Sequence, residues 1–109
     1  MRLSPLDPLM FGLQHTTGLA HFLAGRYEEA LIWESKALRE RPGLLPALRL
    51  VTASNALAGK LEEAKKALAR LLELDPTLRI SNLRDYSMVH RPEDFAKYAD
   101  GLRKAGLPE

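Results

Sequence analysis

Apolar residues recur at helical spacing along most of the chain, with polar residues in the positions between them. In residues 27–41 the apolar positions follow the i, i+3, i+4 rhythm of one buried stripe, namely Tyr27, Ala30, Leu31, Ala37 and Leu38. Residues 61–74 repeat that design with Leu61, Ala64, Leu68, Leu71 and Leu72. Residues 45–58 are apolar almost all round, which is typical of a helix packed between neighbours on two sides. The pattern therefore predicts three helices in this part of the chain.

An earlier helix is predicted over residues 8–24, with Asp7 as its N-cap and Pro8 at its first helical position. Gly12 and Gly18 each cost about 1 kcal/mol relative to alanine, so packing has to stabilise this helix. A glycine inside a helix also lets a neighbouring helix approach closely, and Gly18 is placed for such a contact. Gly25 is predicted to end the helix as a left-handed cap.

The last third of the chain follows a different pattern. Residues 77–86 predict a short helix, and residues 87–91 predict a loop. A final helix begins at Pro92, and its expected buried stripe consists of Phe95, Tyr98, Ala99 and Leu102. Gly106 is its predicted C-terminal cap, with Pro108 behind it.

Two short segments of the chain repeat each other at an interval of 34 residues. They are Gly-Arg-Tyr-Glu-Glu-Ala at residues 25–30 and Gly-Lys-Leu-Glu-Glu-Ala at residues 59–64, and the same interval separates Pro8, Pro42 and Pro76. Units of this length stack into a solenoid, because each buries its apolar face only against its neighbours. We therefore predict a single all-α domain over residues 1–109. It has one repeat at residues 8–42, a second at 43–76, and a short helix with a capping helix at 77–109.

The composition of the 109 residues is that of a soluble globular protein, with 46% hydrophobic and 28% charged residues. The 16 basic residues are scattered among 14 acidic ones, so no basic block predicts binding to nucleic acid or to an anionic membrane. No apolar run approaches the roughly 20 residues that span a bilayer, and residues 1–8 lack the pattern of a signal peptide. Together with the absence of cysteine, these features predict a cytoplasmic protein.

The two units resemble the tetratricopeptide repeat. In the first unit the resemblance rests on Gly18, Ala20, Gly25, Tyr27, Ala30, Ala37 and Pro42. In the second unit it rests on Ala47, Leu48, Gly59, Leu61, Ala64, Leu72 and Pro76. It implies a right-handed superhelix of helix-turn-helix repeats in a protein that binds other proteins. The chain departs from the family pattern at Thr52 (the counterpart of Gly18), at Glu34 (usually aromatic) and at Gln14 (usually Trp or Leu).

Pro8 predicts more chain of the same kind upstream. By the 34-residue interval it closes an earlier unit, so this chain is expected to be the C-terminal part of a longer array. Residues 101–109, Gly-Leu-Arg-Lys-Ala-Gly-Leu-Pro-Glu, are similar to the C-terminal ends of repeat regions in multidomain bacterial signalling proteins. Some of those proteins carry an adenylate or guanylate cyclase domain upstream. This second resemblance implies that any catalytic part lies outside this chain.

The adjacent carboxylates of the chain are explained by helix structure. Glu28-Glu29 and Glu62-Glu63 both fall in the first turn of a helix, where the helix dipole favours negative charge. Neighbours in sequence do not face each other on a helix, so these pairs do not predict acid–base catalysis. Trp33 is expected to pack partly against a neighbouring helix, with an exposed anchor for a partner as the alternative.

The histidines do not predict a metal site. His15 and His21 are six residues apart, about 240° round a helix, so they cannot hold one metal ion together. His90 lies alone in a loop. The sequence contains no Gly-rich phosphate loop and nothing that marks a Ser/His/Asp arrangement. We therefore expect no catalytic, cofactor or metal site in this chain.

The resemblance also indicates where a partner would bind. In the tetratricopeptide family the first helix of each unit lines a concave groove, which assigns the groove here to His15, Leu19, Phe22, Arg49, Ala53 and Ala56. Apolar side chains with one cation suit an amphipathic or extended peptide, although half of these residues are equally explained as core. Leu19 and Ala53 stand where family members that grip a C-terminal carboxylate carry asparagine, so that mode of binding is not expected.

Two functions follow from these observations, and neither is enzymatic. The first is a protein-interaction module that binds a peptide or a partner domain in its groove. The second is a structural or self-association scaffold attached to an upstream signalling enzyme. In the second case a homodimer would form through the N-terminal surface at Leu9, Met10 and Leu13, which missing upstream helices would leave open. Catalysis by this chain itself ranks third.

Overall fold

The computed structural model describes residues 10–85 and 89–109, and within those ranges it is helical without a strand. The described residues form five α-helices: α1 (Met10–Leu23), α2 (Tyr27–Glu40), α3 (Leu45–Leu57), α4 (Leu61–Leu74) and α5 (Pro92–Ala105). A 3-10 helix, η1 (Ile80–Asp85), lies between α4 and α5. No described helix is both long enough and apolar enough to cross a membrane. The all-α prediction is therefore confirmed for the described residues.

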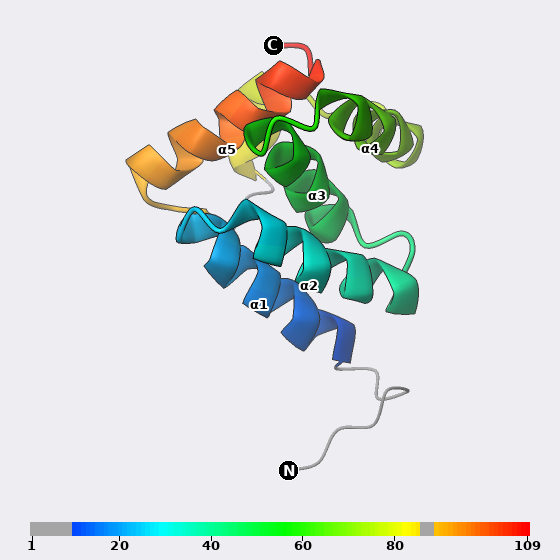
Figure 1. Cartoon of the computed structure of the whole chain (residues 1–109). Helices are drawn as coiled ribbons and strands as arrows, with labels where there is room; N and C mark the ends of the chain where they lie inside the picture. The colour runs from blue at the N-terminus through cyan, green and yellow to red at the C-terminus, as the bar shows by residue number, and fades with distance from the viewer. Residues whose placement is uncertain (1–9, 86–88) are drawn as a thin grey trace.

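The helices form two hairpins and a closing element. The α1–α2 hairpin packs beside the α3–α4 hairpin, and α2 lies between α1 and α3 (Figure 1). Helix α5 packs mainly against α3, with smaller contacts to α4 and η1. The buried core runs through all of these elements, and its largest fully buried apolar side chains are Phe22, Leu71, Leu78, Leu83 and Leu102.

The 34-residue repeat of the sequence is also a repeat of backbone conformation. Gly25 and Gly59 both end a helix in the left-handed region, with φ of 78° and 82°. The residues that follow them, Arg26 and Lys60, both have φ of −95°. At the far ends of α2 and α4, the backbone amides of Arg41 and Asp75 both donate to the carbonyl four residues earlier at 2.8 Å. The backbone therefore has the same conformation at the start and at the end of the second helix in both hairpins.

Most predicted helix bounds agree with the structure to within one or two residues. Helix α4 has the predicted bounds, and Gly106 caps α5 in the left-handed conformation, as predicted, with φ of 114°. The predicted short helix over residues 77–86 is corrected to the 3-10 helix η1, which starts later because residues 75–78 form a turn. The predicted helix start at Pro8, its cap Asp7, the predicted end of the short helix at residue 86 and the first two residues of the predicted loop, 87–88, lie outside the described residues.

The C-terminal segment is bonded back to the first residues of η1. The amides of Ile80 and Ser81 donate to the carbonyls of Pro108 and Glu109 at 2.9 and 2.8 Å. Leu107 is buried, and its amide donates to the carbonyl of Leu102 in α5 at 3.0 Å. These contacts hold the C-terminal end of α5 in place over the second hairpin.

Candidate functional site

The six predicted groove residues lie on α1 and α3, but the structure does not leave them on an open surface. Phe22 and Ala53 are fully buried, and Ala56, Arg49 and His15 are buried as well. Only Leu19 is partly exposed, and it packs against the same core. The expectation of an open groove lined by these residues is therefore corrected, because the chain covers them itself. Whether they contact a partner stays a prediction.

Helix α5 covers Phe22, Arg49 and Ala53. Gly101 sits against the backbone of α3: a Cβ atom at this position would lie 2.9 Å from the carbonyl oxygen of Ala53. The ring of Tyr98 meets the ring of Phe22 edge-on, with centroids 6.0 Å apart and an interplanar angle of 84°. These two contacts place α5 across the side of α3 that the sequence assigned to a partner, and against the C-terminal end of α1 at Phe22 (Figure 1).

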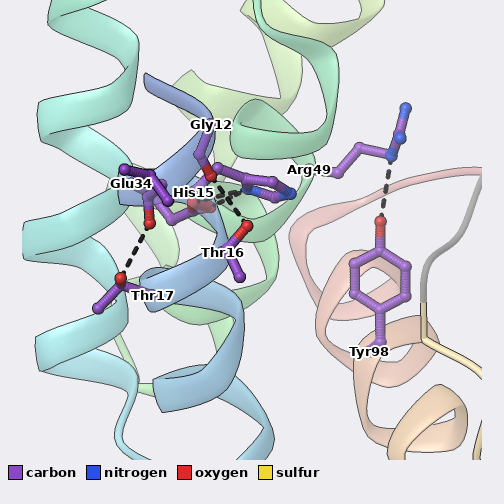
Figure 2. A network of polar contacts seen from close by, with 8 residues as sticks. Gly12, His15, Thr16, Thr17, Glu34, Arg49 and Tyr98 are labelled. Atoms are coloured by element: carbon purple, nitrogen blue, oxygen red, sulfur yellow. Dashed lines mark hydrogen bonds and ion pairs between the residues drawn. The ribbon is translucent and has the colours of Figure 1, made fainter. Parts of the chain in front are cut away.

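Arg49, the predicted cation of the groove, points toward α5 and not to solvent. Its Nε–H donates to the hydroxyl oxygen of Tyr98 at 3.2 Å, and both side chains are buried (Figure 2). Burial raises the pKa of Tyr98 to about 12, against the opposite effect of Arg49, so the phenol stays neutral at physiological pH. The Arg49 guanidinium therefore makes a buried hydrogen bond that joins α3 to α5.

A second buried polar contact joins α1 to α2, and the sequence alone did not predict it. His15 Nδ1 lies 2.8 Å from both carboxylate oxygens of Glu34, whose side chain is fully buried (Figure 2). Gly18 makes room for this carboxylate, because a Cβ there would lie 2.8 Å from three Glu34 side-chain atoms. The signals in the sequence were the glycine in a helix and the glutamate in place of an aromatic residue.

Burial dominates the electrostatics of this pair. It raises the pKa of Glu34 to about 7, although the hydrogen bond and the charge of His15 act in the opposite direction. The pair carries no net charge when it holds one titrating proton, either as an ion pair or as two neutral groups. A single buried neutral pair of this kind can stabilise the contact between two helices or make that contact depend on pH. A fully buried carboxylate offers no access to a substrate, so the arrangement does not indicate catalysis.

The remaining candidates behave as surface residues. Glu28 is exposed and pairs with Lys60 of the other hairpin at 2.8 Å. Trp33 is partly buried, and Lys36 of the same helix lies over its ring at 4.3 Å from the centroid. His90 is exposed and lines a small cavity with Arg84 and Phe95, beside residues that the structure does not describe. Within residues 10–85 and 89–109, no group of three or more His, Asp or Glu side chains is arranged to hold a metal ion.

Comparison with known proteins adds no relative. The sequence matches no protein-family model, no curated protein and no solved structure. The functional argument therefore rests on the geometry of this chain.

Proposed function

We propose that this chain is a protein-interaction module built as a tetratricopeptide-like solenoid, with two repeats and α5 as the capping helix. The observation that carries the proposal is the 34-residue repetition of the hairpin backbone at Gly25 and Gly59. Repeated helical hairpins present long continuous surfaces, and such surfaces are used to bind proteins and peptides. The module has no activity of its own in this proposal, and it acts in the cytoplasm.

The groove assigned from the sequence needs a rearrangement before a partner can use it. While α5 is in place, a peptide reaches only Leu19 among the six predicted residues. Binding in the groove would therefore displace α5, whereas binding on another face would not. This distinction can be measured.

The test begins with photo-crosslinking of the full chain in cells, followed by calorimetry with the purified partner. Leu19→Lys should weaken binding by about tenfold or more, which is ~1.4 kcal/mol, if the groove is the site. Lys65→Glu on the exposed side of α4 is the matched control and should leave the affinity unchanged. Thermal unfolding of both variants checks that the fold is retained. A chain that captures no protein under these conditions would contradict the proposal.

A scaffold that self-associates is the second candidate, and one observation favours it. Leu13 on the outer side of α1 is 50% exposed, so part of the surface predicted to pair is apolar; Met10 is partly buried and Leu9 lies outside the described residues. In this proposal the chain joins copies of an upstream signalling enzyme, of the adenylate or guanylate cyclase kind. Sedimentation at several concentrations would show a dimer if the second candidate is correct, and a monomer if it is not.

A further inference from the structure

The outer side of α1 is uncharged along its whole length. Four residues of this helix are exposed, and they are Leu13, Thr16, Ala20 and Leu23. Their spacing of three, four and three places them on one side of the helix, and Leu13 and Leu23 are 50% and 37% exposed. No Asp, Glu, Lys or Arg occurs anywhere in Met10–Leu23, whereas the exposed sides of α2, α4 and α5 all carry charged residues. We call these four residues the outer face of α1.

The 34-residue repeat shows what happens to the same face in the second hairpin. The counterparts of Leu13, Thr16 and Ala20 on α3 are Ala47, Leu50 and Ser54. Ala47 and Ser54 are fully buried and Leu50 is 3% exposed. Indeed, no residue of α3 is exposed. The two helices thus have the same place in the repeat, but among the described residues only α3 has a neighbour on this side.

The neighbour that covers the face of α3 is α2. Helix α5 meets α3 at Arg49 and Ala53. Gly18 faces Glu34 in the second helix of its own hairpin. By the 34-residue repeat, its counterpart Thr52 is expected to face α4 in the same way. Ala47, Leu50 and Ser54 lie on the opposite side from Thr52, where α2 packs against α3 (Figure 1). The face of α3 that α2 covers is therefore the counterpart of the exposed outer face of α1.

The outer face of α1 can be covered without leaving polar groups unpaired. The hydroxyls of Thr16 and Thr17 donate to the carbonyls of Gly12 and Leu13, both at 2.9 Å. Thr52 makes the same bond to Leu48 at 2.8 Å while fully buried, so a threonine with this bond is tolerated in an interface of this fold. Beside the face, a Cβ at Gly12 would meet no atom within 4 Å, which leaves space for close approach of another helix.

We infer that the outer face of α1 docks a helical hairpin of the kind that this chain itself forms. The second helix of that hairpin lies on α1 as α2 lies on α3, so the new contact continues an interface already present in the chain. Since α1 offers neither charge nor a free hydroxyl there, the contacting side of the docked helix is apolar and uncharged. The inference gives the proposed module a second contact surface, apart from the groove, whose partner class is a helical hairpin. It rests on the solenoid architecture of that proposal.

A second copy of the chain fits this face less well than such a hairpin. The counterpart of α2 in the second hairpin is α4, and in a head-to-tail pair α4 would have to cover α1. Helix α5 already packs against α4, where Leu68 lies 3.5 Å from the Cβ position of Gly106. A two-fold symmetric pair would instead pack α1 against α1 of the other copy. That contact joins two first helices, unlike the contact of α2 with α3 inside the chain. The second copy is therefore kept as an outcome of the test.

The test uses a hairpin of known structure as the probe. Residues 10–43 are duplicated ahead of Met10 in the full chain, so that the added copy of α2 can reach the original α1. We expect the amides of the original α1 to exchange with solvent at least about tenfold more slowly, or ~1.4 kcal/mol, than in the unextended chain. Leu13→Glu with Ala20→Glu in the original α1 should abolish this protection. The same two substitutions should leave the unextended chain folded, because both positions are exposed.

Ile32→Glu in the original α2 is the matched control. Ile32 is 55% exposed and lies on the side of α2 away from Glu34, so the protection should persist in this variant. Unchanged exchange in the extended chain would overturn the inference, as would protection that survives the Leu13 and Ala20 substitutions. A concentration-dependent dimer of the unextended chain that Leu13→Glu disperses would assign the face to a second copy and also overturn it. Partner binding is measured on a separate face, so either failure leaves the proposed function standing.

Discussion

The carboxylate of Glu34 fills the space that a side chain at Gly18 of α1 would need. A Cβ atom at Gly18 would lie 2.8 Å from Cγ, Cδ and Oε1 of Glu34. The same carboxylate is held by His15, one turn earlier on α1, at 2.8 Å. The glycine and the glutamate therefore depend on each other, and a larger residue at position 18 would require a change at Glu34.

Gly18→Ala should destabilise the protein, although alanine favours helices by about 1 kcal/mol. The added methyl group collides with three atoms of the buried Glu34 side chain and forces it out of its position against His15, so we expect a net loss of about 1–3 kcal/mol. Gly12→Ala is the matched control in the same helix, because a Cβ there meets nothing within 4 Å. It should stabilise the protein by up to about 1 kcal/mol. Urea denaturation measures the free energy of unfolding of both variants. Equal changes in the two variants would contradict the close contact between Gly18 and Glu34.

Glu34 should make the stability of the protein depend on pH. Burial raises its pKa from 4.5 to about 7, so the folded state favours the protonated form. This stabilising effect is complete below pH 4.5 and is lost as the pH rises through about 7. Above that range Glu34 carries a buried negative charge. At ~1.4 kcal/mol for each pH unit between 4.5 and about 7, the expected loss is on the order of 3 kcal/mol.

Thermal unfolding between pH 5 and pH 8.5 measures this dependence. Glu34→Gln keeps the shape of the side chain and removes the titration, so its stability should change less across the range than that of the parent chain. Glu63→Gln, which changes an exposed glutamate, controls for net charge. Parallel curves for Glu34→Gln and the parent would show that another group causes the effect.

Tyr98→Phe should cost about 1–3 kcal/mol. The substitution removes the hydroxyl that accepts a hydrogen bond from Arg49 at 3.2 Å, and it leaves a buried guanidinium with one contact fewer. Tyr27→Phe is the control: Tyr27 also contacts the ring of Phe22, at 5.5 Å between centroids, but it is partly exposed. That change should be close to neutral. Guanidinium denaturation followed by circular dichroism separates the two outcomes.

Gly101→Ala should loosen α5 from α3. A Cβ atom at this position would lie 2.9 Å from the backbone oxygen of Ala53, which cannot move without shifting the helix. We expect faster hydrogen exchange in α5 and a loss of stability of about 1–3 kcal/mol. Gly43→Ala meets no atom within 4 Å and should change neither quantity. If a partner uses the covered groove, Gly101→Ala should also raise its affinity, and unchanged affinity would place that partner elsewhere.

The helices, their ends and the repeat could be predicted from the sequence, because each depends on residues close together in the chain. Gly25, Gly59 and Gly106 end helices in the left-handed conformation that glycine adopts without strain. Pro92 begins α5 at a position where its missing N–H removes no hydrogen bond. Even the close approach at Gly18 was expected from a glycine inside a helix, although the group that fills the space was not.

The tertiary structure alone decided which surfaces are covered. His15 and Glu34 are 19 residues apart, and Arg49 and Tyr98 are 49 apart, so each contact depends on how whole helices dock. The sequence assigned Arg49 and Ala53 to a groove, since they lie on the first helix of a repeat. It could not show that α5 folds back across α3, because the direction of that return is set by the packing of Gly101 and Leu102 and by the bonds from residues 80–81 to residues 108–109. Local preferences determined the helices, and long-range packing determined which of their faces remain free.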